Sequence, residues 1–218
     1  MTSLKKKSLA HLDELVARYP ALAAVRGEVV RAASLLCACH RKKKKILICG
    51  NGGSAADSLH LAGELMKSFA LPRPLPAADI KQLRRAGVAD GKIFAARLQQ
   101  GISALALTGN PALNTAIAND TAPELVFAQQ VYVLGQPGDI LIGLSTSGKS
   151  RNVIAALKVA RARGLATIGF SGGAPAPMDA WCDVVLKAAA RETFKVQEQH
   201  LPLYHTLCLM AEEELFGQ

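Results

Sequence analysis

The residues best suited to chemistry lie in and just after a glycine-rich turn. Residues 46–65 read ILICGNGGSAADSLHLAGEL, which is an apolar run, then Gly50-Asn51-Gly52-Gly53-Ser54, then a helical pattern. Glycines let a backbone approach a ligand closely, and the start of a helix presents free N–H groups to an anion. The spacing departs from the dinucleotide fingerprint GxGxxG, which argues against a nicotinamide enzyme. A tight strand–helix turn without a ligand is the alternative.

Two residues of the predicted helix could move protons or hold a metal. His60 and Glu64 are four residues apart, so they share one face of the helix. A histidine and a carboxylate at this spacing can divide acid–base work or chelate a metal ion. Such a pair alone is more often a simple surface contact, but its position after a glycine-rich turn favours a function.

A serine-rich segment, GLSTSGKS at residues 143–150, has two interpretations. It matches the P-loop pattern GxxxxGK[ST] literally. A P-loop enzyme also needs a second strand that ends in Asp to manage magnesium, and the predicted strands do not end in Asp. The other interpretation is a phosphate cup of hydroxyls and backbone N–H groups, which holds a sugar phosphate without a nucleotide.

The C-terminal residues 192–216 have apolar side chains at helical spacing. Gln197 and His205 are eight residues apart, so they lie near one face of the predicted helix. Pro202 predicts a bend in it. The alternative for this segment is an amphipathic oligomerisation helix whose two histidines, His200 and His205, are incidental.

Short apolar runs alternate with helical patterns through most of the chain. This alternation predicts an α/β fold, a doubly wound five-stranded parallel sheet with helices on both faces. Ligands gather at the carboxyl ends of the strands in such sheets. The predicted strands are residues 46–49, 102–108, 139–145, 166–170 and 183–187.

Two further segments lie outside this alternation. Residues 8–19 and 21–41 have apolar residues at helical spacing and flank Pro20, so they predict an N-terminal extension of two helices. Residues 70–100 contain LPRPLP at 71–76 and continue with many charges. They predict an excursion from the sheet, a loop with one or two short helices.

The composition bounds the class of protein. The 218 residues are 50% apolar, which suffices for a compact domain that folds without disulfides. The five cysteines form no CxxC pair, which predicts free buried thiols and a cytoplasmic location rather than a cysteine zinc site. No apolar run approaches the length of about 18 residues that a membrane span needs, and the N-terminus lacks the core of a signal peptide.

The formal net charge is +9, and the excess lies mainly in Lys5–Lys7 and Arg41–Lys45. Such runs form a solvated face or attract acidic partners, either phosphorylated metabolites or nucleic acid. Aromatic residues do not interleave with the basic runs, which argues against a single-stranded nucleic-acid surface. We therefore expect a small phosphorylated partner rather than nucleic acid or a membrane.

Together, these segments resemble the sugar isomerase (SIS) family, and most closely its phosphoheptose isomerase branch. The resemblance implies a SIS domain over residues 42–218, with residues 1–41 as N-terminal helices of the same unit. The matching pieces are GNGGSAADSLHLAGEL, AIAND at 116–120, PELVFAQQV at 123–131, GDILIGLSTSGKSRNVIAAL at 138–157 and VQEQHLPLYHTLC at 196–208.

The resemblance implies a phosphosugar aldose–ketose isomerase. The reaction would convert sedoheptulose 7-phosphate to D-glycero-D-manno-heptose 7-phosphate for surface glycans, by moving a proton between C1 and C2 through an enediol. The alternative is a non-catalytic SIS protein that binds a phosphosugar or a protein partner, as a replication-initiation regulator of this family does. Such a protein need not keep acid–base residues, and this chain keeps both Glu64 and His205.

The resemblance also implies a role for each matching residue. Glu64 and His205 correspond to the acid–base pair, and no nucleotide cofactor is expected. Zinc, one ion per subunit, would be held by His60, Glu64, Gln197 and His205. The phosphate would be held by Ser145, Thr146, Ser147 and Ser150. The rest of the substrate would be lined by Asn51, Gly52, Gly53, Ser54, Glu64, Asn119, Asp120 and Gln197.

Some positions depart from the family pattern. Lys149 replaces the asparagine of STSGNS, Lys195 replaces an arginine, and Ser68 stands where an arginine is expected. Lysine holds phosphate as a point charge but not as a bidentate fork. The excursion at about 78–99 is longer than in typical members.

The resemblance finally implies a homotetramer with its active site between subunits. The sequence gives a separate reason for association. Residues 8–41 and the C-terminal helix offer apolar faces that a parallel sheet does not need for its own cover. Surplus apolar faces on a soluble chain mark association surfaces, and closed symmetric assemblies bury them.

Overall fold

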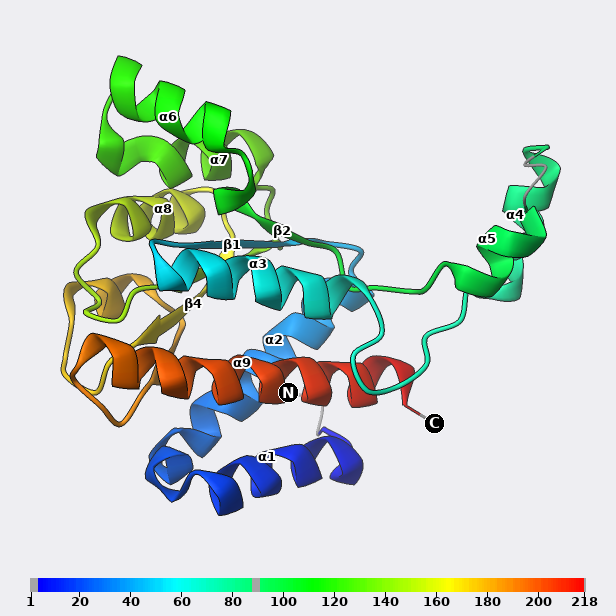
Figure 1. Cartoon of the computed structure of the whole chain (residues 1–218), viewed down its shortest axis with the longest axis horizontal. Coiled ribbons are helices and arrows are strands. Elements are labelled where there is room, and N and C mark those ends of the chain that lie inside the picture. The colour runs from blue at the N-terminus through cyan, green and yellow to red at the C-terminus, as the bar shows by residue number, and fades with distance from the viewer. Residues whose placement is uncertain (1–3, 88–90, 218) are drawn as a thin grey trace.

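A five-stranded sheet forms the centre of the molecule (Figure 1). The computed structural model describes residues 4–87 and 91–217. Outside the described part lie residues 1–3, 88–90 and 218, which belong to the predicted segments 1–41, 70–100 and 42–218 respectively. The strand order is β2-β1-β3-β4-β5 and every pair is parallel, which confirms the predicted fold class. The strands are β1 (Ile46–Gly50), β2 (Ala104–Ala106), β3 (Ile140–Leu144), β4 (Ala166–Ser171) and β5 (Val184–Lys187).

Helices cover both faces of the sheet, and the alternation of β1 shows why. Ile46 and Ile48 point into one apolar cluster, and Leu47 and Cys49 point into the other. The first cluster is closed by α1 (Lys6–Arg18), α2 (Arg26–Arg41), α3 (Gly53–Met66) and α9 (Thr193–Phe216). The second is closed by α6 (Pro111–Asp120), α7 (Val126–Leu134) and α8 (Arg151–Ala162).

The edge strand β2 is shorter than the predicted strand 102–108. It pairs with β1 only from Ala104 to Ala106, and the chain then turns through a 3₁₀-helix, Leu107–Gly109. Leu107 is nevertheless buried, in the second cluster. An apolar run cannot reveal this boundary because the strand and the turn bury their side chains equally well.

The two predicted N-terminal helices are present, with one change at their junction. Pro20–Val25 form a 3₁₀-helix, and the second α-helix begins only at Arg26. Leu12, Leu22 and Leu36 are buried in the same cluster as the sheet, because α1 packs on α9 and α2 packs on α9 and β5. The surplus apolar face predicted for residues 8–41 is therefore wrong. The division into residues 1–41 and 42–218 stays a prediction.

The predicted C-terminal helix is present as α9. We predicted a bend at Pro202, but α9 is one continuous helix from Thr193 to Phe216, and Figure 1 shows it without a sharp kink. Pro202 is buried, and Thr206 Oγ1 donates to its carbonyl oxygen at 2.8 Å. The helix lies beside α3, so residues from opposite ends of the chain become neighbours.

The predicted excursion contains two short helices, α4 (Ala77–Arg85) and α5 (Gly91–Arg97). They pack against each other and extend away from the rest of the molecule (Figure 1). The excursion leaves the body after α3 and returns to it before β2.

Two expectations drawn from composition concern thiols and membranes. All five cysteines are free, and each of them is buried except the half-buried Cys182. Burial raises the pKa of Cys37 to about 12, so this thiol stays protonated at neutral pH. In the described part of the chain, each helix is too short or too polar to cross a membrane.

Candidate active site

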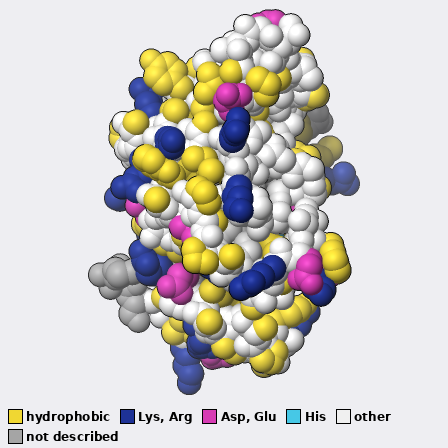
Figure 2. Space-filling view, turned by 90° about the vertical axis from the view of Figure 1, so that its left-hand side faces the viewer, with side chains coloured by type: hydrophobic (Ala, Val, Ile, Leu, Met, Phe, Trp, Pro, Cys, Tyr) yellow, Lys and Arg dark blue, Asp and Glu magenta, His cyan; other side chains and the backbone are white. Residues whose placement is uncertain are grey.

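The glycine-rich turn lies at the carboxyl edge of the sheet, between β1 and α3. Gly52 has a φ of +55°, a conformation that glycine adopts without strain. A Cβ atom at Gly50 would lie 2.6 Å from the carbonyl oxygen of Ser54. Figure 2 views the molecule from the side on which α3 and α9 begin. On that face, Lys and Arg side chains are scattered among hydrophobic patches and fewer Asp and Glu side chains.

The predicted substrate-lining residues of this turn contact two other elements. Asn51 Nδ2 donates to Asn152 Oδ1 at 2.9 Å, and Asn152 Nδ2 donates to Asn51 Oδ1 at 2.8 Å. Gly53 lies against the Gln197 amide, because a Cβ atom at Gly53 would overlap Gln197 Nε2. Ser54 is buried, and its N–H donates to Asn51 O at 3.0 Å. The turn is thus joined to both α8 and α9.

The predicted phosphate cup, Ser145–Ser150, connects β3 to α8. The Ser145 and Ser150 hydroxyl oxygens are 2.9 Å apart, and the Lys149 N–H donates to Ser147 Oγ at 3.2 Å. Gly148 has a φ of +64°, and a Cβ atom there would overlap the Cβ atom of Ala176. The loop therefore directs hydroxyls and the start of α8 to one place, which suits an anion.

A cavity of about 340 Å³ opens beside this loop. Thr146, Ser147 and Lys149 line it from the loop, and Arg191 lines it from the segment before α9. Across residues 4–87 and 91–217, neither Lys149 nor Arg191 has an ion-pair partner. The cavity therefore has free positive charge.

The predicted acid–base residues meet where α3 lies beside α9. His60 Nε2 is 3.2 Å from Glu64 Oε1 and 3.4 Å from His205 Nε2. Lys67 Nζ donates to Glu64 Oε2 at 2.9 Å, which places a cation on the carboxylate. The His205 ring also packs on Phe69, with centroids 5.3 Å apart. We refer to His60, Glu64 and His205 as the acid–base cluster.

Two residues that sequence analysis missed extend the acid–base cluster into the protein. The Tyr204 hydroxyl lies 3.1 Å from His60 Nδ1 and donates to Asp57 Oδ1 at 3.2 Å. Asp57 precedes His60 by three residues, so helical spacing could have found it. Tyr204 is adjacent to His205 in sequence, and only the packing of α9 against α3 brings it to His60.

The surroundings shift the protonation of these groups. Burial and the neighbouring His60 lower the pKa of His205, and the Glu64 carboxylate opposes them only in part. Burial raises the pKa of Asp57 although the Tyr204 hydroxyl donates to it. Burial also raises the pKa of Tyr204. Because the pKa of His205 is lowered, its imidazole is neutral at neutral pH.

Asn119 and Asp120 lie at the end of α6. Both are exposed, and Asn119 Nδ2 donates to Asp120 Oδ1 at 2.8 Å. Among the described residues, no side-chain hydrogen bond joins this pair to the glycine-rich turn, the Ser145–Ser150 loop or the acid–base cluster.

His200 belongs to the core. Its ring is fully buried against Phe170, with centroids 5.5 Å apart, and its Nε2 atom lies 3.4 Å from the Ser171 carbonyl oxygen. Burial lowers the pKa of His200 to about 4. The expectation of incidental histidines in this helix therefore holds for His200, which packs in the core, and not for His205, which joins the acid–base cluster.

The four residues implied as zinc ligands do not all meet within one chain. His60, Glu64 and His205 are in contact, whereas Gln197 lies at Gly53, more than two helical turns from His205 along α9. Among the described residues, no three or more His, Cys, Asp or Glu side chains have donor atoms placed to hold a metal ion. The donor set of one chain, as arranged, is not a complete zinc site.

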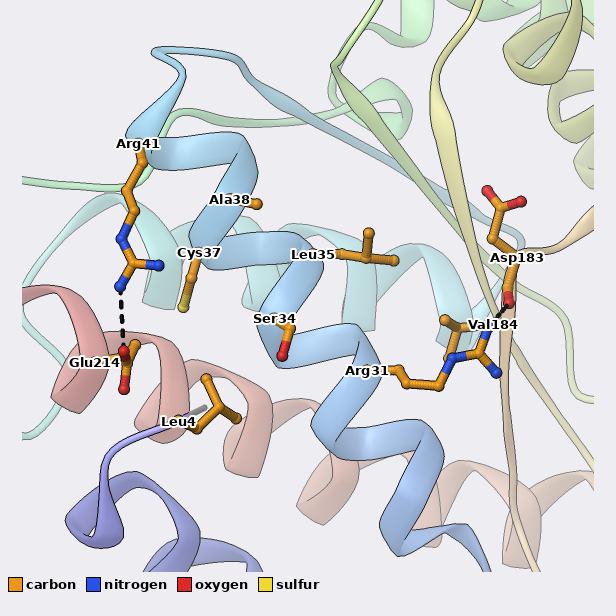
Figure 3. Close-up of a pocket in the computed structure, with 10 residues that line it drawn as sticks. All are labelled: Leu4, Arg31, Ser34, Leu35, Cys37, Ala38, Arg41, Asp183, Val184 and Glu214. Atoms are coloured by element: carbon orange, nitrogen blue, oxygen red, sulfur yellow. Dashed lines mark hydrogen bonds and ion pairs between the residues drawn. The ribbon is translucent and has the colours of Figure 1, made fainter. Parts of the chain in front are cut away.

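A second cavity, of about 440 Å³, is lined by none of these groups (Figure 3). It opens between α2, the start of β5 and the end of α9, and Leu35 and Val184 give it an apolar wall. Its arginines are engaged, because Arg41 pairs with Glu214 at 3.1 Å and Arg31 donates to the Asp183 carbonyl oxygen at 2.7 Å. It therefore lacks the convergent groups of an active site.

Comparison with known proteins identifies the family of this chain. Residues 89–172, which include the serine-rich loop, match the SIS domain. A phosphoheptose isomerase from Burkholderia pseudomallei is 36% identical over 211 residues, covering 97% of this chain and 94% of the relative. The chain belongs to the phosphoheptose isomerase family. Another such isomerase, from Synechocystis, is 40% identical and covers 88% of this chain and 86% of its own.

Solved structures of phosphoheptose isomerases share the fold. The structure from Neisseria gonorrhoeae has a TM-score of 0.69 and 34% identity, over 92% of this chain and 94% of its own. The structure from Francisella tularensis has a TM-score of 0.74 and 26% identity, and the match covers 98% of this chain and 100% of that structure's chain. Membership of the phosphoheptose isomerase family makes the P-loop interpretation of residues 143–150 wrong.

Proposed function

We propose that this protein is an aldose–ketose isomerase that converts sedoheptulose 7-phosphate to D-glycero-D-manno-heptose 7-phosphate for heptose synthesis. The observation that supports this most is the meeting of His60, Glu64 and His205 from two helices of a phosphoheptose isomerase fold. The reaction moves one proton between C1 and C2 of the sugar, so it needs a base for a C–H bond and a group that handles two oxygens.

Glu64 is the proposed base. It takes the proton from C1 of the ketose, the C–H electron pair forms the C1–C2 double bond, and the C2 carbonyl oxygen is protonated by the acid to give the enediol. Glu64 then returns the proton to C2, and the hydroxyl on C1 gives its proton back to the acid as the C1 aldehyde forms. Lys67 and His60 hold the Glu64 carboxylate from both of its oxygens, at 2.9 Å and 3.2 Å. These contacts fix the carboxylate in one orientation, which proton transfer requires.

His205 is the proposed acid. Because its pKa is lowered, a neutral imidazole donates its N–H to the sugar oxygen on which negative charge develops. Two neighbours orient the His205 ring. His60 Nε2 lies 3.4 Å from His205 Nε2, and the Tyr204 and His205 ring centroids are 5.0 Å apart. We assign Tyr204 and Asp57 as positioning residues.

The Ser145–Ser150 loop is the proposed phosphate site. Its hydroxyls and the start of α8 hold the dianion, and Lys149 adds charge at its rim. The glycine-rich turn with Asn51, Gly52 and Gly53, together with Asn119, Asp120 and Gln197, is proposed to line the sugar.

Zinc stays a prediction of the family resemblance. If one ion per subunit binds, the residues implied to hold it are His60, Glu64, Gln197 and His205, and zinc would polarise the sugar oxygens. Because Gln197 lies elsewhere in the chain, we derive no step that depends on the metal. Metal analysis of the purified protein, before and after dialysis against a chelator, tests the prediction.

We also propose a cytoplasmic homotetramer. The free cysteines support a reducing compartment. Exposed apolar side chains support association. Among them are residues on α3, α7, α9 and the excursion, and none of the large ones in the described part lies on the N-terminal helices: Leu59, Met66, Tyr132, Val133, Ile93, Phe94, Leu98, Phe194 and Leu201. Light scattering on dilute protein tests this.

The decisive experiment is turnover of a panel of ketose phosphates by the purified protein, with and without a chelator. We expect conversion of sedoheptulose 7-phosphate, followed by NMR of the sugar, and no conversion of unphosphorylated sedoheptulose. Binding of a phosphosugar without turnover of any panel member would instead support the non-catalytic SIS alternative.

A further inference from the structure

The excursion between α3 and β2 has no cover of its own. We call residues 75–98 the arm, of which 75–87 and 91–98 are described. Every residue of α4 is exposed or half-buried, and Ile93, Phe94 and Leu98 at α5 are 52%, 38% and 48% exposed. Helices as short as these are unstable alone in water, so their apolar side chains need a covering surface.

The root of the arm is nevertheless rigid. Arg73 and Glu212 form a buried ion pair, with side chains 0% and 1% exposed and 2.7 Å between the charged atoms. Glu212 also accepts backbone N–H groups of residues 69–71, at 2.8 to 2.9 Å. Pro74 pairs with Gln99 in an antiparallel bridge. The two ends of the arm are therefore clamped to each other and to α9, which fixes where the arm starts.

The arm is also basic. Its described residues carry five cations against the single carboxylate of Asp79, and no ion pair joins any of these cations to a carboxylate within residues 4–87 and 91–217. The surface that receives the arm therefore has apolar side chains and accessible acidic groups. The cations are Lys81, Arg84, Arg85, Lys92 and Arg97.

Such a surface lies around the acid–base cluster. Leu59 and Met66 on α3 are 51% and 57% exposed, and Leu201 on α9 is 40% exposed. A groove of about 260 Å³ between α1 and α9 runs beside His205. Glu14 contributes a carboxylate to this groove; it pairs with Arg18 at 3.6 Å, and its side chain remains 60% exposed. The His60 side chain is itself 44% exposed. A site for enediol chemistry excludes water when it closes, and one chain alone leaves this site open.

We propose that the arm of one copy docks across α3 and α9 of a second copy and covers its acid–base cluster. The contact is in trans because the arm leaves its own body at the end of α3 and points away from its own cluster (Figure 1). The chemical meaning of this cover rests on the proposed isomerase function. The docking itself does not, because it follows from the exposed apolar and charged residues.

An armless variant tests the docking. Because Pro74 and Gln99 already lie side by side, a Gly-Gly link can replace residues 75–98 without opening the root. We expect light scattering to give a smaller assembly than wild type, and isomerase activity to fall about 10²-fold while the circular dichroism stays native. An armless protein with wild-type mass and activity overturns the proposal, and the mass result needs no substrate.

A point variant covers the case in which the armless protein does not fold. Phe94→Asp places a carboxylate in the apolar face of the arm. Leu125→Asp, in the 3₁₀-helix Pro123–Leu125, is its matched control because both side chains are 38% exposed. We expect Phe94→Asp to lower the assembly mass and Leu125→Asp to leave it unchanged. Equal masses for the two variants overturn the proposal.

Mixed assemblies test whether the arm acts in trans. The armless variant has an intact Glu64 and no arm, and Glu64→Gln has an intact arm and no base. We expect the mixture to be about tenfold more active than the sum of the separate proteins, because the arm of one chain covers the cluster of the other. No gain on mixing, with mixed assemblies demonstrated by mass, overturns a contact in trans.

Discussion

The phosphate cup and the acid–base cluster are built in opposite ways. The cup comes from six consecutive residues, Ser145–Ser150, and depends on backbone conformation and hydroxyls. The acid–base cluster joins His60 to His205 across two helices and depends on side chains. A local loop should tolerate changes outside its backbone and its hydroxyls, whereas an assembled cluster should fail when any of its members is lost.

The largest effect is expected within the acid–base cluster. Glu64→Gln and His205→Ala each remove a proton-transfer group, so kcat should fall by about 10²–10⁴. The melting temperature and the affinity for the phosphosugar should change little, because neither residue holds the fold or the phosphate. Turnover assays measure kcat, isothermal titration calorimetry measures the affinity, and thermal unfolding measures the melting temperature. Wild-type turnover in either variant would show that the cluster is not the catalytic centre.

The phosphate cup should instead be most sensitive to a change in its backbone conformation. Gly148→Ala requires a side chain at a φ of +64° and an overlap with Ala176, so we expect a loss of about 1–3 kcal/mol in unfolding free energy and a raised KM. Gly27→Ala is the control, because no atom lies within 4 Å of a Cβ atom at Gly27 in α2. Denaturant unfolding compares the two, and an unaffected Gly148→Ala would contradict the role of the loop backbone.

A smaller effect is expected one contact away from the acid–base cluster. Tyr204→Phe keeps the ring and removes the hydroxyl that links His60 to Asp57, so kcat should fall about tenfold with little change in KM. Tyr132→Phe on the exposed face of α7 is the control. A change in KM rather than kcat would place the hydroxyl in substrate binding instead of positioning.

The same contrast explains what the sequence could predict. The strands and the serine-rich loop are local features, since apolar runs and a glycine at positive φ act within a few residues. The contact of Tyr204 with His60 arises only when α9 packs on α3, and no spacing encodes it. Asp57 could have been found from the sequence, because it lies three residues before His60 and on the same face of α3.

The N-terminal helices show how little a sequence pattern reveals about tertiary packing. Their apolar stripes were visible in the sequence, but amphipathicity does not reveal which surface a stripe covers. Leu12 and Leu36 are buried in this chain's own core, whereas Phe94 and Leu98 on the arm are exposed. Which apolar side chains stay exposed is therefore visible only in the structure, and association of the chain remains a proposal.

The smallest effect is expected at Lys149, at the rim of the cup. The family pattern has asparagine here, and the lysine side chain is exposed, where a single charge contributes little because water screens it. Lys149→Asn should therefore keep kcat and raise KM for the phosphosugar by about twofold, more at low salt than at high salt. Ser145→Ala, which removes a buried hydroxyl of the same loop, should raise KM by a larger factor that does not depend on salt. Loss of turnover in Lys149→Asn would mean that the cup depends on a charged side chain, and the contrast between a cup of backbone and hydroxyls and a cluster of ionisable side chains would fail.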